Sequence, residues 1–128
     1  MRAMNKILIV DDNTLNLDIL RDVLKEGYKL SIAKNGKIAL KILEKNVPDL
    51  ILLDIMMPIM DGYETFENIV KDDRLLGIPV VFLSGVDTLD PSVVALDPER
   101  FVKLLHKPFD IPEVIEVIQK ALKGDASE

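Results

Sequence analysis

Residues 48 to 62 read PDLILLDIMMPIMDG and place an acid, Asp54, at the end of an apolar run of strand length. Leucine and isoleucine fill positions 50 to 53, as is typical of a strand that is buried on both faces of a sheet. A carboxylate inside such a strand either loses its hydration or stays protonated, and both cost free energy. We therefore expect either that the strand ends at Asp54 and the acid faces water, or that a cation lies beside it.

Four more segments have strand composition. They cover residues 6–10, 29–33, 79–84 and 103–106. Helices with one apolar face are expected between the strands, including one near residues 63–71, and a last helix is expected after Asp110. Strands that alternate with helices indicate βαβ units. The predicted fold class is therefore α/β, with a doubly wound, five-stranded parallel sheet that carries helices on both faces.

Capping signals mark the ends of these helices. Asp11, Asp12 or Asn13 can cap the first helix, and Gly27 is expected to end it. Asp110 with Glu113 forms a capping box for the last helix. The expected apolar faces are Leu17, Leu20 and Leu24 in the first helix, Ile38, Leu40, Ile42 and Leu43 in the second, and Val114, Ile115, Ile118 and Leu122 in the last.

Length and composition bound the possible functions. The 128 residues suit one domain, expected over residues 1–124, with 125–128 as a polar tail or the start of a linker. No apolar stretch approaches the roughly 18 residues of a membrane span. The chain has no cysteine, which suits the reducing cytoplasm. Its net charge is −6 and it lacks a basic cluster with aromatic residues, so we expect no direct binding to nucleic acid.

Polar side chains follow four of the predicted strands. Asp11 and Asp12 follow the first strand, Asp54 the third, Ser84 the fourth and Lys107 the fifth. In a doubly wound sheet the carboxyl ends of the strands form the ligand site, so these side chains are expected to meet. Three nearby carboxylates repel one another, and a hard cation with oxygen ligands, Mg²⁺, would relieve the repulsion. The hydroxyl and the ammonium group could then hold a phosphoryl group, which suits phosphoryl transfer to a carboxylate.

Each residue of this group also has a structural explanation. The two acids after residues 6–10 could merely cap a helix, and Asp54 could be an ordinary acid at a strand end. Ser84 could belong to a turn, and Lys107 could be a surface lysine. His106 has no nearby histidine or cysteine and is interpreted as a structural residue of the last strand. Their placement at corresponding strand ends favours the functional interpretation.

Four motifs together resemble the receiver domain of two-component response regulators. They read ILIVDDN, DLILLDIMMPIMDG, VVFLSG and HKPFD, occur in this order and extend over most of the chain. The resemblance implies a flavodoxin-like sheet with strand order 2-1-3-4-5 and a cis peptide bond between Lys107 and Pro108. It also implies a signalling module that catalyses only its own phosphorylation and dephosphorylation, and so is not an enzyme with a separate substrate.

The resemblance implies a role for each residue of the site. Asp54 would accept a phosphoryl group from a sensor histidine kinase or a phosphotransfer protein, and Ser84 and Lys107 would contact the phosphate. Magnesium would bind Asp12 and Asp54 directly, Asp11 through water, and the backbone carbonyl of residue 56. Phosphorylation would then alter an interaction with a downstream target or output domain. The sequence names neither the kinase nor the target, and it leaves open whether the receiver stands alone.

The chain departs from the family pattern at two places, and two further residues bear on the lifetime of the phosphorylated state. Leu104 occupies a switch position that often holds tyrosine or phenylalanine. Residues 88–101, TLDPSVVALDPERF, contain Asp-Pro twice, so helix 4 is expected to be short or irregular. Met56 and Val86 lie two residues after the acceptor and the hydroxyl, where their side chains cannot activate a water molecule, so we expect them to lengthen the life of the phosphorylated state.

Three other functions fit parts of the pattern. A phosphohydrolase with an aspartyl intermediate would require a second acid at position 56, but this residue is methionine. A flavin carrier would want a Ser/Thr/Gly-rich loop after the first strand, where the sequence is DDNTLN. A degenerate receiver that only binds proteins is disfavoured by the intact acid, hydroxyl and lysine set, although Leu104 keeps it open.

Overall fold

A computed structural model of the chain describes residues 4–86 and 88–123. Five parallel strands form one sheet in the order β2-β1-β3-β4-β5, which confirms the expected topology. Their bounds are Lys6–Val10 (β1), Lys29–Ala33 (β2), Leu50–Asp54 (β3), Val80–Ser84 (β4) and Val102–His106 (β5). β3 is central and all of its residues are buried, which explains its unbroken apolar sequence.

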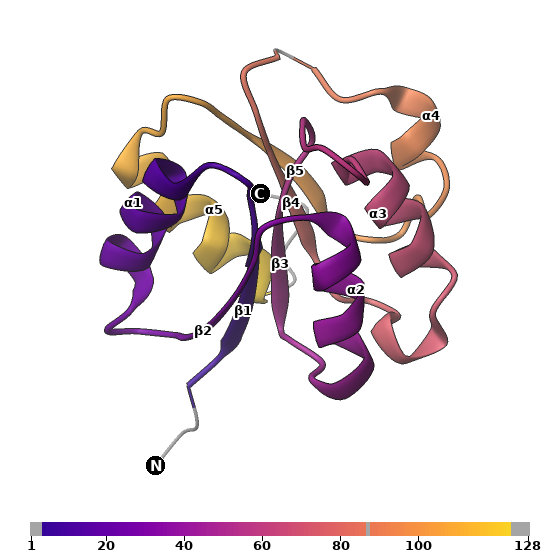
Figure 1. Cartoon of the computed structure of the whole chain (residues 1–128), viewed down its shortest axis with the longest axis horizontal. Helices are drawn as coiled ribbons and strands as arrows, with labels where there is room; N and C mark the ends of the chain where they lie inside the picture. Colours follow the sequence, from indigo (N-terminus) through magenta and orange to yellow (C-terminus); the bar gives the residue numbers. More distant parts are fainter. Residues whose placement is uncertain (1–3, 87, 124–128) are drawn as a thin grey trace.

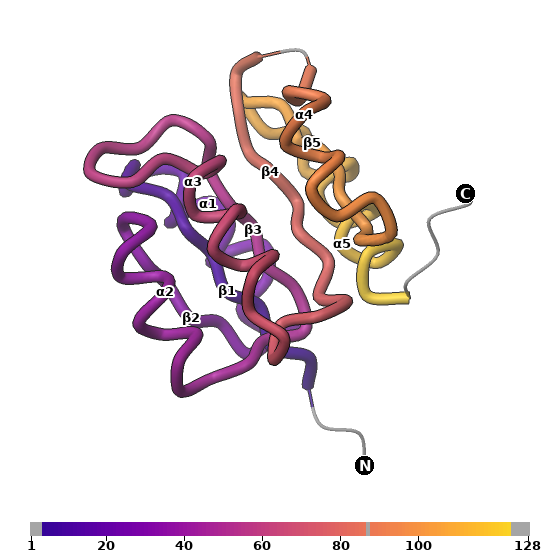
Figure 2. Tube along the Cα trace, turned by 90° about the vertical axis from the view of Figure 1, so that its right-hand side faces the viewer, coloured from indigo at the N-terminus to yellow at the C-terminus, as the bar shows by residue number. Residues whose placement is uncertain are grey.

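Helices cover both faces of the sheet (Figure 1). They are Thr14–Leu24 (α1), Gly36–Lys45 (α2), Gly62–Val70 (α3), Pro91–Val94 (α4) and Ile111–Lys123 (α5), with a 3-10 turn at Asp73–Leu75 (η1). Helices α1 and α5 lie on one face, and α2, α3 and α4 lie on the other. Figure 2 looks onto the face of the sheet that α2 and α3 cover. No helix among the described residues is both long and apolar enough to span a membrane.

The first helix begins after one of the three predicted cap residues, but it ends differently from the prediction. The side chain of Asn13 accepts a hydrogen bond from the Asn16 N–H, so Asn13 is the cap and the two preceding acids are not. The helix ends at Leu24, and Gly27 does not adopt the left-handed conformation that a C-terminal glycine often supplies. Because Asn13 is the cap, Asp11 and Asp12 lie outside the helix, at the carboxyl end of β1.

Two predicted apolar positions face outward. Ile38 in α2 is 43% exposed and Ile115 in α5 is 41% exposed. In α2 the neighbouring Ala39 is buried instead, and in α5 the neighbouring Val114 is buried. A small side chain lets a helix approach the sheet closely, so α2 buries part of its interface through alanine and not through the larger residue beside it.

The segment before β5 is irregular, as expected. Helix α4 has 4 residues and begins at Pro91. Asp90 caps it, because the Asp90 side chain accepts a hydrogen bond from the Ser92 N–H. The second Asp-Pro pair does not start a helix. Asp97 instead pairs with buried Arg100 at 2.9 Å, and the Arg100 guanidinium donates to the carbonyls of Leu75 and Ile78. These bonds fasten the segment to the turn that follows α3.

The predicted domain limits lie partly outside the described residues. The fold accounts for residues from β1 to the end of α5 at Lys123. The expected tail, residues 125–128, and the last residue of the expected domain, 124, fall in the range that the structure does not describe.

Candidate functional site

Three carboxylates meet at the carboxyl edge of the sheet. Asp11 and Asp12 follow β1, and Asp54 ends the neighbouring strand β3. One carboxylate oxygen from each lies within 4.8 Å of the other two. Asp11 is fully buried, Asp54 is 2% exposed, and Asp12 is open to solvent. The sequence prediction that these acids converge is therefore correct, and the buried pair lies behind an accessible third acid.

Lys107 provides the cation that Asp54 needs. Its ammonium nitrogen lies 3.1 Å from Asp54 Oδ1 and 3.1 Å from Asp11 Oδ2. The backbone after β5 is fastened to β4, because the Lys107 N–H donates to the Ser84 carbonyl at 2.9 Å. The Lys107–Pro108 bond is cis, as expected. Of the two alternatives posed by the sequence, the second therefore applies: Asp54 ends the strand but is buried and does not face water, and a cation lies beside it.

Backbone N–H groups hold two of the site's oxygen atoms. The Met56 N–H donates to Asp54 Oδ1 at 3.3 Å, and the Val86 N–H donates to Ser84 Oγ at 3.1 Å. Ser84 itself is buried. The side chains of Met56 and Val86 are 73% and 47% exposed. These two apolar residues thus lie on the rim of the site, on the loops that follow β3 and β4.

Burial raises the pKa of Asp54 to about 6. The largest cause is the loss of hydration, followed by the negative charge of Asp11, while Lys107 acts in the opposite direction. A divalent cation among the three carboxylates would oppose the first two effects. The all-oxygen donor set, its spacing and this unrelieved repulsion therefore fit a hard cation such as Mg²⁺.

Asn16 joins the site although the sequence interpretation missed it. Its side-chain amide donates to Asp11 Oδ2 at 3.3 Å, and the Asn13 N–H donates to Asp11 Oδ1 at 2.9 Å. Together with Lys107, these donors occupy both oxygens of Asp11. The available signal was the position of Asn16 in the first turn of α1, where a side chain can reach back toward the end of β1.

The loop between β3 and α3 folds tightly against the end of β3. The Gly62 N–H donates to the Ile55 carbonyl at 2.8 Å. A Cβ atom on Gly62 would collide with the carbonyl oxygen of Asp54, which explains why glycine occupies this position. Within the same loop, Ile59 has a φ of 73° and is 71% exposed. A β-branched residue is strained in this left-handed region, so the loop next to Asp54 stores backbone strain.

Leu104, the predicted switch position, is half-buried beside an aromatic cluster. It is the register partner of Phe82, whose ring packs edge-on against Tyr63 and Phe66 at centroid distances of 5.6 and 5.3 Å. The leucine belongs to the apolar core on the side of α2 and α3. The aromatic cluster near this position thus contains Tyr63 of α3, which the sequence interpretation did not single out.

Comparison with known proteins points to one family. A family model of the response regulator receiver domain matches residues 7–119. The polar-differentiation response regulator DivK of Brucella anthropi is 34% identical over 126 residues, which is 94% of this chain and 97% of DivK. A probable transcriptional regulator, ycf29 of Porphyra purpurea, is 34% identical over 97% of this chain, but the chain spans only 59% of that protein.

A solved structure resembles the fold closely. The receiver domain of the sensor histidine kinase PA1611 from Pseudomonas aeruginosa superimposes with a TM-score of 0.80, at 25% identity, over 94% of this chain and 99% of that one. That structure contains a magnesium ion in its active-site cleft. The family match therefore extends from β1 into α5 and includes all four strand ends that build the acidic site.

Proposed function

Because the chain belongs to the response regulator receiver domain family, we propose that Asp54 accepts a phosphoryl group and thereby controls a protein–protein interaction. The observation that carries the proposal is the buried Asp54 carboxylate, held 3.1 Å from the Lys107 ammonium among two further acids. Phosphorylation-dependent signalling is the function of this family. The assignment of individual roles within this chain is our proposal.

The transfer requires one bond to form and one to break. A carboxylate oxygen of Asp54 attacks phosphorus while the bond from phosphorus to the donor's imidazole nitrogen breaks, and the imidazole leaves with its electron pair. Lys107 is placed to neutralise charge on the phosphoryl oxygens. The Ser84 hydroxyl already accepts the bond from the Val86 N–H, so its own hydrogen is available to a phosphoryl oxygen.

Magnesium is the proposed cofactor. When bound, the ion would neutralise the acids and the incoming phosphoryl oxygens. Asp12 and Asp54 would bind it directly, Asp11 through water, and residue 56 through its backbone carbonyl. The exposure of Asp12 and the occupied oxygens of Asp11 support this division. Calorimetric titration tests it, since Asp12→Asn should weaken Mg²⁺ binding more than Asp11→Asn, and equal losses would contradict it.

The proposed partners follow from the same chemistry. A phosphohistidine on a sensor kinase or phosphotransfer protein would supply the phosphoryl group, and a downstream target or output domain would read the result. The site supports self-phosphorylation and self-dephosphorylation without a separate substrate. The phosphohydrolase alternative is disfavoured because Met56, an exposed methionine, stands where that mechanism needs a second acid. The absence of nucleic-acid binding and a cytoplasmic location stay predictions.

The proposal is tested by incubating the protein with Mg²⁺ and acetyl phosphate. Mass spectrometry should find one base-labile phosphoryl group on Asp54. Asp54→Asn should abolish it, and Lys107→Ala should slow its formation. Asp73→Asn, an exposed acid in η1, is the matched control and should behave like the parent. Full-rate modification of Asp54→Asn would refute the assignment.

A further inference from the structure

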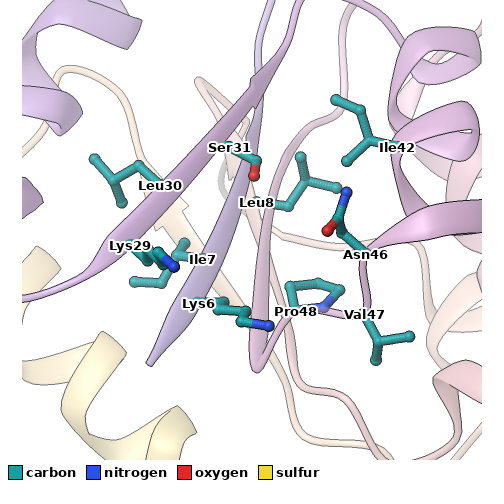
Figure 3. Close-up of a pocket in the computed structure, with 10 residues that line it drawn as sticks. All are labelled: Lys6, Ile7, Leu8, Lys29, Leu30, Ser31, Ile42, Asn46, Val47 and Pro48. Carbon is teal, nitrogen blue, oxygen red and sulfur yellow. The ribbon is translucent and has the colours of Figure 1, made fainter. Parts of the chain in front are cut away.

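A second concave site lies at the opposite edge of the sheet from the acids. A cavity of about 240 Å³ opens at the amino ends of β1 and β2, beside the loop that joins α2 to β3 (Figure 3). Its volume is smaller than the roughly 300–1,000 Å³ of pockets for drug-sized ligands and larger than a cavity of about 150 Å³ that holds benzene. The space therefore suits one ring-sized molecule.

Two lysines stand side by side at this cavity. Lys6 and Lys29 are register partners in the neighbouring parallel strands β1 and β2, so their side chains leave the same face of the sheet. Both line the cavity and both are exposed. Within residues 4–86 and 88–123, neither ammonium group forms an ion pair or a hydrogen bond. Adjacent like charges repel, and the Asp49 carboxylate, which accepts a hydrogen bond from the Lys6 backbone N–H at 2.7 Å, offsets only part of the positive charge of the pair.

Polar side chains also line the interior. Ser31 lies in the middle of β2, opposite Leu8, yet it is exposed because the cavity leaves it uncovered. Asn46, which follows α2, extends toward the sheet in Figure 3. In the described part of the chain, neither side chain has a hydrogen-bond partner. A hydroxyl and an amide are therefore free to bind an oxygen atom near the lysines.

The remaining wall is partly apolar. Leu8 of β1 and Pro48 of the loop before β3 are buried beneath it, so half-buried Ile42 of α2 and exposed Val47 supply most of its apolar surface. This surface lies beside the polar groups and can contact one side of a hydrocarbon ring. Lysines on an exposed strand often serve only to keep a sheet edge soluble. That explanation accounts for the two charges, but it does not account for a cavity with unbonded polar groups and an apolar wall.

We propose that this cavity binds a small organic anion, namely a carboxylate or phosphate monoester attached to a ring-sized apolar body. The lysine pair would hold the anionic group, with Ser31 and Asn46 as hydrogen-bond partners, and the apolar wall would contact the ring. The cavity includes Lys6 and Leu8 of β1, whose other end carries Asp11 and Asp12, so a bound anion would contact a strand that also builds the acidic site.

The experiment is an amide NMR titration with benzoate and phenyl phosphate, and with the neutral analogue benzamide. Saturable shifts should map to Leu8, Ser31 and Val47, with a dissociation constant of about 1 mM as expected for so few atoms. Benzamide should bind at least roughly fivefold more weakly, because it lacks the charge. Inorganic phosphate, which lacks the ring, should also bind more weakly than phenyl phosphate.

Variants separate the proposal from its alternatives. Lys6→Gln and Lys29→Gln should each weaken benzoate binding roughly fivefold, whereas Lys37→Gln on the exposed side of α2 should not. Ser31→Leu should block the cavity to every probe. Equal binding of benzoate and benzamide would overturn the role of the lysines. Shifts confined to Ser84 and Lys107 would place the anion at the acidic site and overturn the proposal, as would shifts that never saturate.

Discussion

The phenol oxygen of Tyr63 in α3 accepts a hydrogen bond from the backbone N–H of Asp90, with an N–O distance of 3.1 Å. Asp90 is the cap residue of α4, and the Tyr63 ring packs on Phe82 of β4. Phe82 in turn is the register partner of Leu104. One tyrosine thus connects the start of the short helix α4 to the strands that lead to Ser84 and Lys107.

Tyr63→Phe should loosen α4 without disturbing the core. The substitution removes the hydrogen bond and keeps the ring contact with Phe82, so the expected loss of stability is about 1 kcal/mol. Hydrogen exchange should accelerate at Val93 and Ala95, whose N–H groups close the turns of α4, and stay unchanged in β3. Tyr28→Phe is the matched control. Equal acceleration in both variants would contradict a specific role for the Tyr63 hydroxyl.

The irregular segment should respond to phosphorylation more than Leu104 does. Leucine has no large ring to move between buried and exposed positions, whereas residues 88–101 contain only 4 helical residues, and their backbone hydrogen bonds close short local turns. Segments of this kind open at low free energy and can be ordered by a new contact. Hydrogen exchange with Mg²⁺ and a beryllofluoride phosphate mimic should show increased protection within residues 88–101. Unchanged protection across that range would contradict a role of this segment in the response to phosphorylation.

Asp54→Asn should stabilise the metal-free protein near neutral pH. The folded pKa of Asp54 is about 6, above the ordinary value of 3.8, so the folded state holds more protons than the unfolded state between these values. The contribution of the Asp54 carboxyl group to the free energy of unfolding is therefore fully present below pH 3.8 and is lost as the pH rises through about 6. At pH 7 the parent protein has lost about 3 kcal/mol of this free energy of unfolding. The asparagine variant has no carboxyl group at position 54, so it should not show this loss.

Urea denaturation at several pH values measures this difference. The variant and the parent should converge as the pH falls from about 6 to about 4, and Mg²⁺ should stabilise the parent alone, because the ion binds the folded state. Asp73→Asn should show neither effect. A gap between Asp54→Asn and the parent that does not change with pH would mean that the stability difference has another origin.

The sequence predicted the sheet and the residues at its strand ends well, because both depend on local patterns. Apolar runs marked the strands, and four of the runs ended in residues that a parallel sheet brings together. The burial of Arg100 could not be predicted, since its partners are carbonyls at Leu75 and Ile78, more than 20 positions earlier. The contact between Tyr63 and Asp90 depends in the same way on how α3 packs, which no local pattern in either segment indicates.

The conformation of Ile59 lay beyond sequence reasoning for a different reason. The loop after β3 must return within a few residues to place Gly62 against Ile55, and this closure imposes the positive φ at position 59. Isoleucine disfavours a positive φ, so the amino acid at position 59 gave no indication of the backbone conformation that the structure adopts. A closed loop can thus override the preference of one residue, at a cost in stability.

Ile59→Gly should therefore stabilise the protein by about 1 kcal/mol, because glycine removes the strain of the left-handed backbone conformation. Glycine also makes the unfolded chain more flexible, which lowers stability, but this effect is smaller than the relief of strain. Leu76→Gly is the matched control: Leu76 is 78% exposed but has an ordinary φ of −58°, so the same change should destabilise there. Equal, destabilising effects at both positions would show that Ile59 is not strained. Chemical denaturation of the three proteins measures the difference.

The phosphorylated state should be comparatively long-lived, because the rim of the site lacks a group that activates water. Hydrolysis needs a water molecule in line behind phosphorus, and Met56 and Val86 stand on the loops that flank the acceptor and the hydroxyl. Neither side chain can accept a proton, and both can crowd the approach. Loss of such assistance slows the step by about tenfold, or roughly 1.4 kcal/mol of barrier.

The test for this lifetime is to phosphorylate the protein, remove the donor and follow decay in Mg²⁺. The double variant Met56→Asn with Val86→Glu supplies polar groups at both rim positions and should decay about tenfold faster than the parent. Leu76→Asn, at an exposed apolar residue with an ordinary φ of −58°, is the control for a merely more polar surface and should leave the decay rate unchanged. If the double variant and the parent decay alike, the two apolar side chains do not set the lifetime, and water must reach phosphorus by a path that they do not obstruct.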